Sequence, residues 1–451
     1  LVFLIFFASG FCGLLYQVVW LRMAFASFGI ITPVLSVVIS VFMLGLSLGS
    51  WGGGKFISKL TYKTGISAII FYALIEFFIG SGAFAVPNLF LLSEKFISLF
   101  GEMNSFKYLF FSALLIGGSI LPWCVFMGAT FPFMMSFVKE IDASNTTSFS
   151  YLYLVNIIGA MCGTLITAFV LIELLGFSQT LLVGACLNFA IAIISILLGL
   201  RFPYRITSPV VNNKVNVLKD AATILKEKKS FVLAILFTTG FVSMSLEVLW
   251  IRAFTPVLKT TVYAFASILT VYLLGTWIGS YIYRRDLSKK NVLSTEKLII
   301  FLSASAFLPI LFNDVRINLK PIGVLITILP FCSILGYLTP KLIDQYSMGN
   351  PHDGGKAYAI NILGSIIGPI FATYVFLTFL STKLSMILLA SPFLIFSITG
   401  YKSSTYRKRW QFGLGFLVIA LLLSSVFLIV SFEELFYKDG LIRRDHTATV
   451  I

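Results

Sequence analysis

Apolar residues recur along the chain in long runs separated by short polar stretches. A membrane-spanning helix needs about 20 mainly apolar residues. Thirteen runs approach or exceed that length: 1–21, 31–54, 65–92, 108–137, 149–172, 178–200, 231–251, 261–283, 298–313, 321–340, 357–380, 384–401 and 411–431. The first is too long for a signal peptide and lacks a small-residue cleavage site. The pattern predicts an all-α polytopic membrane protein with thirteen spans.

The second half of the chain repeats the first in the same order. Residues 1–55 align without gaps to 231–285 at an offset of 230. Two further blocks match, 121–132 with 329–340 and 156–163 with 361–368. Six spans separate the two copies, so both halves have the same orientation. Parallel six-span halves are the layout of major-facilitator-type transporters.

This duplication predicts two parallel six-helix repeats plus a thirteenth transmembrane helix. The expected parts are a first repeat at 1–200, a basic cytoplasmic linker at 201–230, a second repeat at 231–401, the thirteenth span at 402–432 and, at 433–451, the truncated start of a soluble domain. Because the chain starts at Leu1 rather than Met, we expect it to be a piece of a longer protein.

Composition supports the membrane assignment. Hydrophobic residues make up 58% of the chain, charged residues 11%, and the mean hydropathy is +0.98. Soluble chains carry about 25% charged residues, so a water-soluble enzyme, a disordered chain and a disulfide scaffold are excluded. The five cysteines lie inside apolar runs, without metal-ligand spacing, and are expected to be core residues.

The net charge of +15 would suggest a nucleic-acid partner in a soluble protein. Sorted by loop, however, 22 of the 33 basic residues lie on one side of the membrane and eight on the other. The positive-inside rule therefore predicts a bacterial cytoplasmic (inner) membrane protein with a cytoplasmic N-terminus and an extracytoplasmic C-terminal tail. We expect the lipid bilayer, and no nucleic acid, as a partner.

Two acidic residues fall inside predicted spans. Glu76, counted from Lys63 at 1.5 Å per residue, lies about 20 Å into a core about 30 Å thick. An ionisable group at that depth is a functional hypothesis by default, with a structural, hydrogen-bonded Glu as the alternative. Glu247 lies about 27 Å beyond Lys229, where an anchor at the outer membrane interface is the alternative.

Three further polar residues complete the candidate substrate- or ion-binding set. Gln17 stands in the first repeat where Glu247 stands in the second, so the halves are chemically different. Asn156 and Asn361 are expected to hydrogen-bond across helices. Arg22 is expected to extend to the membrane surface.

Small residues at four-residue spacing predict close helix packing. The glycines are Gly45, Gly49, Gly159, Gly163, Gly275, Gly279, Gly364 and Gly368. Prolines in spans four and ten free backbone carbonyls, so hinges or a broken-helix binding site are the functional alternative. These prolines are Pro122, Pro132, Pro330 and Pro340. No catalytic triad, phosphate-binding glycine loop or zinc pattern is present, so we expect no catalytic residue, metal or cofactor in this chain.

Several motifs, taken in order, resemble one known family. They are Ser9-Gly10 with Tyr16–Arg22, Leu44–Ser50, Leu74–Glu76, Gly128–Pro132 and Tyr153–Gly163. Over nearly the whole chain the sequence resembles the membrane portion of the fused spermidine-synthase-like (polyamine aminopropyltransferase-like) multi-pass membrane proteins. The tail from Phe436 to Ile451 resembles the first strands of the soluble domain that follows in that family. Gln17 departs from the Glu usual at its position.

This resemblance implies a membrane domain that anchors, and supplies substrate to, a C-terminal aminopropyltransferase- or methyltransferase-like domain. Decarboxylated S-adenosylmethionine would bind only to that missing domain, so no catalytic residue is carried over and enzymatic activity stays open. The charge count also places that domain outside the cytoplasm, away from its co-substrate. One alternative is a major-facilitator-like transporter of a small cation such as a polyamine, bound through Glu76 and Glu247. Another is a structural subunit that docks on other membrane subunits.

Overall fold

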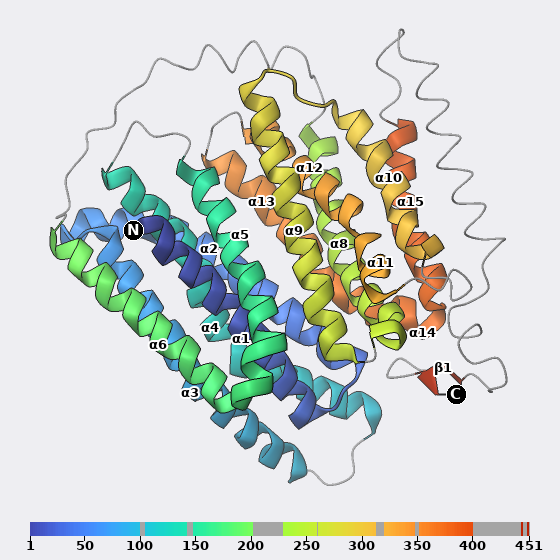
Figure 1. Cartoon of the computed structure of the whole chain (residues 1–451), viewed down its shortest axis with the longest axis horizontal. Helices are drawn as coiled ribbons and strands as arrows, with labels where there is room; N and C mark the ends of the chain where they lie inside the picture. Colours follow the sequence, from blue (N-terminus) through green and yellow to red (C-terminus); the bar gives the residue numbers. More distant parts are fainter. Residues whose placement is uncertain are drawn as a thin grey trace. The chain divides into compact units, whose positions relative to one another are not determined.

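The computed structural model is built almost entirely of helices (Figure 1). It describes residues 1–99, 104–141, 148–201, 229–258, 260–312, 320–347, 351–399, 443–444 and 449–450. The described strands are β1 (Arg443–Arg444) and β2 (Thr449–Val450), which pair antiparallel. The prediction of an all-α membrane protein is confirmed for the described part of the chain.

The helices follow the predicted apolar runs. The first half of the chain forms α1 (Val2–Phe28), α2 (Thr32–Thr64), α3 (Ala68–Ser98), α4 (Ser105–Ile141), α5 (Ser148–Ile166), the π-helical turn η1 (Thr167–Leu171) and α6 (Ile172–Arg201). The second half forms α8 (Lys229–Leu258), α9 (Thr261–Ser288), α10 (Thr295–Phe312), α11 (Pro321–Ile326), α12 (Leu329–Ser347), α13 (Pro351–Phe371), the π-helical turn η3 (Ala372–Phe376), α14 (Leu377–Phe379) and α15 (Thr382–Thr399).

The described residues contain ten helices long and apolar enough to cross a membrane, against thirteen predicted spans. One of the ten, Leu154–Arg201, has 48 residues and covers two predicted spans. Its chain direction changes at Gly176, where φ is 71°; such an angle suits glycine because it has no Cβ. A shorter apolar helix covers Thr382–Phe393, and the thirteenth predicted span lies outside the described residues. The count of thirteen therefore stays a prediction.

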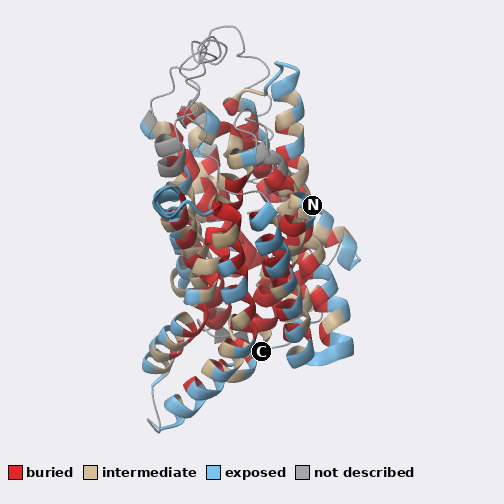
Figure 2. Ribbon diagram, turned by 90° about the vertical axis from the view of Figure 1, so that its left-hand side faces the viewer, coloured by how far each residue is buried: buried red, intermediate tan, exposed pale blue. Residues whose placement is uncertain are grey.

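The chain divides into two compact units. Unit 1 comprises residues 1–30, 37–228 and 350–362, and unit 2 comprises 31–36, 229–349 and 363–451. The domain bounds expected from sequence, 1–200 and 231–401, stay predictions, and most of the linker and of the tail from 402 onward lies outside the described residues. Figure 2 shows buried and exposed stretches alternating along individual helices, as expected for helices that pack on one side and meet lipid on the other.

The predicted glycines lie where two helix backbones meet. A Cβ added to any of them would collide with a neighbouring helix, mostly with its backbone. In unit 1 the contacts are Gly45 with Cys124, Gly49 with Val125, Gly159 with Phe7 and Gly163 with Phe11; in unit 2 they are Gly275 with Cys332, Gly279 with Ser333, Gly364 with Phe237 and Gly368 with Phe241. Each contact in one unit joins positions that align with those in the other. The π-helical turns η1 and η3 also begin at aligned positions, 205 residues apart.

Candidate functional site

Glu76 is the most enclosed of the acidic residues that the structure describes in unit 1. Its side chain is 0% exposed, whereas Leu74 and Phe77 beside it are 53% and 52% exposed. Helix α3 thus turns an apolar side outward and its carboxyl group toward other helices. Glu76 lies about 12 Å along α3 when it is counted from the start of the helix at Ala68.

Donors from two other helices reach the Glu76 carboxylate. Ser9 of α1 donates through Oγ to Oε1 at 2.6 Å, and Asn188 of α6 donates through Nδ2 to Oε2 at 2.5 Å. Tyr72, one turn earlier on α3, also interacts with this carboxyl group. The Asn188 amide is held in turn by Tyr16 of α1, whose hydroxyl donates to Oδ1 at 3.0 Å. The result is a polar cluster that joins α1, α3 and α6.

Glu247 of unit 2 has a different environment. It is 2% exposed on α8, so it is buried rather than anchored at an exposed interface. It has no hydrogen-bond or ion-pair partner among the described residues, in contrast to Glu76. Trp250, three residues on and on the same helical face, is 0% exposed and its indole N–H also lacks a partner in the described part of the chain. The Trp250 ring meets Phe331 edge-on, with centroids 5.7 Å apart.

The first repeat has the same arrangement without the charge. Gln17, the counterpart of Glu247, is 3% exposed. Trp20, the counterpart of Trp250, is buried with an indole N–H that has no partner among the described residues. Trp20 stacks on Tyr16 with centroids 5.1 Å apart. The first repeat therefore has a neutral amide three residues before its tryptophan, and the second repeat has a carboxylate at the aligned position.

The remaining predicted positions lie in helices of both units. Asn156 donates from Nδ2 to the backbone carbonyl of Phe6 at 3.3 Å, the expected bond across helices. Asn361 lies in α13. Pro122 and Pro132 lie inside a continuous α4, and Pro340 lies inside α12. Pro330 is the second residue of α12, just after the two-residue break that ends α11.

The Arg22 side chain contacts the end of the fifth predicted span. Its guanidinium donates to the carbonyl of Ala168 at 3.2 Å and pairs with Glu173 at 3.4 Å. Ala168 belongs to η1, where the i→i+5 pattern leaves carbonyls short of their usual partners. Arg22 therefore binds the π-helical turn, which was not predicted from the sequence.

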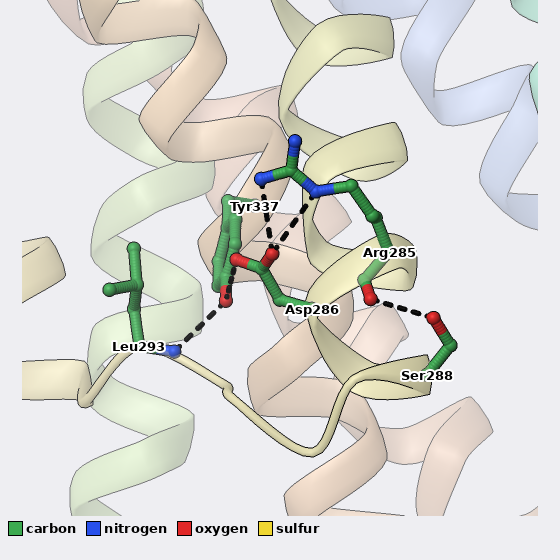
Figure 3. Close-up of polar contacts among 5 residues, drawn as sticks. All are labelled: Arg285, Asp286, Ser288, Leu293 and Tyr337. Carbon is green, nitrogen blue, oxygen red and sulfur yellow. Dashed lines mark hydrogen bonds and ion pairs between the residues drawn. The ribbon is translucent and has the colours of Figure 1, made fainter.

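A second polar cluster, which belongs to unit 2, holds the turn between α9 and α10 (Figure 3). The N–H of Leu293 donates to Tyr337 Oη at 3.0 Å, and this hydroxyl donates to Asp286 at 3.2 Å. Arg285 pairs with the same carboxylate at 3.3 Å. These contacts attach the turn to α12. Because both Tyr337 and Arg285 contact the Asp286 carboxylate, the arrangement favours a structural role for Asp286.

Metal binding finds no support in the residues that the structure describes. They contain no group of three or more His, Cys, Asp or Glu side chains that could hold a metal ion.

The helical fold is similar to the folds of solved membrane transporters. The crystal structure of the nucleoside transporter NupG matches with a TM-score of 0.53 and 14% identity, covering 93% of this chain and 98% of that one. The D-xylose-proton symporter matches with a TM-score of 0.53 and 12% identity, covering 96% and 98%. The peptide transporter POT in complex with sulfate matches with a TM-score of 0.51 and 13% identity, covering 94% of each chain. No family model and no curated protein matches the sequence.

These matches overturn the spermidine-synthase-like resemblance and the anchoring role that it implied. These three solved structures are transporters, and none of them is described as a synthase fusion. The physical reason lies in the motifs that carried the resemblance. Gly45, Gly49, Gly159 and Gly163 are positions of backbone contact. Any tightly packed helical bundle can require small residues there, so these motifs report packing rather than chemistry.

Two members of the Glu76 cluster, Asn188 and Tyr72, were not predicted. Asn188 lies in the apolar run 178–200, and an amide inside such a run is a signal for a hydrogen bond across helices. Tyr72 precedes Glu76 by four residues and so shares its helical face. Both signals were present in the sequence, but neither identifies Glu76 as the common partner.

Proposed function

We propose that this protein is a membrane transporter that carries a small cationic solute, with Glu247 as its anionic contact. The fold supports transport, since solved transporters share it over more than nine tenths of the chain. The observation that carries the choice of residue is the buried Glu247 carboxylate, which has no hydrogen-bond or ion-pair partner among the residues that the structure describes. Buried ionisable groups in membrane proteins are paired, and unpaired ones mark solute or ion pathways.

The surroundings of Glu247 favour a positively charged solute. A carboxylate supplies the countercharge, and the aromatic face of Trp250 lies on the same side of α8. Cations bind over tryptophan rings by attraction to the ring quadrupole. The indole N–H of Trp250, which has no partner in the described part of the chain, provides one donor for an acceptor atom on the solute. Together these groups suit an organic amine that also carries a hydrogen-bond acceptor.

Uptake into liposomes tests this proposal. The purified full chain is reconstituted, and labelled putrescine and choline are compared with labelled uridine, dialanine and xylose. We expect saturable uptake of a cation that falls at least about 100-fold in Glu247→Gln, since removing one partner of a buried charge pair costs about 3–5 kcal/mol. Glu94→Gln changes an exposed carboxylate of α3 and serves as the matched control. Uptake of none of the five solutes, or equal cation uptake by both variants, would contradict the proposal.

The charge distribution supports a cytoplasmic N-terminus in the bacterial inner membrane. Phosphatase fusions after Gly29, between α1 and α2, and after Gly65, between α2 and α3, test it. Activity only after Gly29 agrees with this orientation, and activity only after Gly65 reverses it.

A further inference from the structure

The Glu76 cluster is separate from the residues proposed to bind solute and has chemistry of its own. Its carboxyl group is fully buried in unit 1 and receives hydrogen bonds from α1 and α6 at 2.6 and 2.5 Å. The Tyr72 hydroxyl faces Ser9 and Glu76 but completes no hydrogen bond of good geometry among the described residues. The site thus contains one buried hydroxyl with spare donor and acceptor capacity.

No positive charge balances an ionised Glu76 within the described residues. The polar and titratable side chains around it are Ser9, Cys12 and Tyr16 of α1, Tyr72 of α3, and Asn188 of α6. Helix α4 also packs against α3, and those of its side chains that the structure describes make no charged contact with the carboxyl group. A buried charge without a partner is costly, and such groups are usually neutralised. Either a proton or a bound cation could neutralise this one.

The geometry favours the proton. A metal cation needs oxygen lone pairs directed at it, but Asn188 presents its N–H side to Glu76. That orientation is fixed because the Asn188 oxygen already accepts from Tyr16 at 3.0 Å. The side chains that reach the two carboxylate oxygens, at 2.5 and 2.6 Å, approach them with hydrogen-bond donors. A proton, unlike a metal cation, needs no further oxygen ligands.

We propose that Glu76 is the centre of a reversible proton-binding site formed by α1, α3 and α6. A proton from water forms an O–H bond on the carboxyl group, whose charge changes from −1 to zero. That O–H then donates to Ser9 Oγ or to the Tyr72 hydroxyl, both of which can accept. Ser9 in turn directs its hydrogen to a backbone carbonyl one turn back on α1, as helical serines do. Release of the proton to water restores the observed bonds.

The distances are compatible with both states. An O···O separation of 2.6 Å between Ser9 and Glu76 suits a hydroxyl donating to a carboxylate. The same pair can reverse its direction without moving the helices. Asn188 cannot accept a proton, so its contribution is to stabilise the ionised form. Asn188 is therefore a positioning residue, and its loss must make the site hold its proton to higher pH.

Infrared difference spectroscopy between acid and alkaline pH tests the site on the reconstituted full chain. We expect one component of the C=O band of protonated carboxyl groups to appear as pH falls and to be missing in Glu76→Gln, whose amide resembles the protonated state. Glu247→Gln retains this component because the component comes from Glu76. In Asn188→Leu the midpoint moves up by about 1–2 pH units, since hydrogen bonds to charged groups contribute about 1.5–3 kcal/mol.

Three results would overturn the proposal. One is a band that is unchanged in Glu76→Gln. Another is a Glu76 signal that stays constant at all pH values, which means a permanently charged or permanently neutral group. The third is a signal that depends on sodium concentration rather than on pH, which indicates a cation site with a reversed Asn188 amide. If Glu76→Gln does not fold, the shift in Asn188→Leu decides the question. None of these readouts depends on whether the protein carries a solute.

Discussion

The two units use the same backbone contacts but different buried acids. In unit 1 the Glu76 carboxylate is enclosed by donors from α1 and α6, and in unit 2 the Glu247 carboxylate has no partner among the described residues. The glycine contacts, by contrast, recur at aligned positions in both units. The aligned positions therefore share the packing contacts, while the polar residues around the buried acids differ. A carboxylate that already accepts hydrogen bonds, such as Glu76, suits an internal site. A carboxylate without a partner among the described residues, such as Glu247, suits contact with a ligand.

A second difference concerns prolines at aligned positions. Helix α4 continues through Pro122, whereas its counterpart in unit 2 is broken between α11 and α12, just before Pro330. Proline lacks an N–H, so it is tolerated in the first turn of a helix and disfavoured in its interior. In unit 2 the break places Pro330 in the first turn of a new helix, whereas in unit 1 Pro122 stays in the interior of α4.

The largest effect is expected at the shared glycine contacts. Gly49→Ala and Gly279→Ala would each push a methyl group into the backbone of Val125 or Ser333. Overpacking costs about 1–3 kcal/mol, and more against rigid backbone, so both variants should lose thermal stability by similar amounts. Gly52→Ala, on the same helix but with open space around it, is the control. Melting curves in detergent that differ between Gly49→Ala and Gly279→Ala would break the equivalence of the units.

The aligned prolines should respond unequally. Pro122→Ala restores an N–H inside α4 and should raise stability by up to about 3 kcal/mol. Pro330→Ala acts in the first turn of α12, where the missing N–H has little consequence. Melting temperatures of the two variants measure the difference. A larger gain for Pro330→Ala would contradict this explanation of the break.

Substitutions at the two buried acid sites should affect the free energy of unfolding differently. Asn188→Leu removes a hydrogen bond to a charged group and should cost about 1.5–3 kcal/mol. Glu247→Leu removes no such bond, so it should leave stability unchanged or raise it. Both are followed by thermal unfolding of the detergent-purified protein. Strong destabilisation by Glu247→Leu would mean that this residue has a structural partner.

The smallest expected effect is a pH dependence of stability that comes from Glu140, at the start of α3. Glu140 accepts hydrogen bonds from Ser67 at 2.6 Å and from the Ala68 N–H at 3.0 Å, at the beginning of α3. Burial raises the pKa of Glu140 above its ordinary value of 4.5, and the hydrogen bonds only partly oppose this. A raised pKa means that the stabilisation is complete below the ordinary value and is lost as pH rises through the folded-state value.

The melting temperature should therefore fall slightly as pH rises above 4.5, and Glu140→Gln should lack this decline. In unit 2 the corresponding support for the start of α10 comes from Lys341, which is 1% exposed and donates to Thr295 at 2.5 Å. On the same helix, Asp344 accepts a hydrogen bond from Tyr283 at 2.7 Å. An identical pH response in Glu140→Gln would show that Glu140 is not the titrating group.

Features set by short-range pattern were predictable from the sequence. Apolar runs located the helices, and glycine spacing located the backbone contacts, because both depend on local periodicity. The partners of Glu76 were not predictable, since Ser9 and Asn188 lie 67 and 112 residues away from it. The same limit misled the family assignment, because motifs such as Gly45 and Gly49 specify packing that unrelated bundles share. The π-helical turns and the contact of Arg22 with Ala168 also depend on tertiary structure.

The most direct test of the central claim is equilibrium binding of a labelled amine to the purified protein. The account predicts one saturable site that is weakened at least about 100-fold by Glu247→Gln, with Glu94→Gln and Glu76→Gln binding as the wild type does. Binding that survives in Glu247→Gln, or that is lost in Glu76→Gln instead, would contradict it.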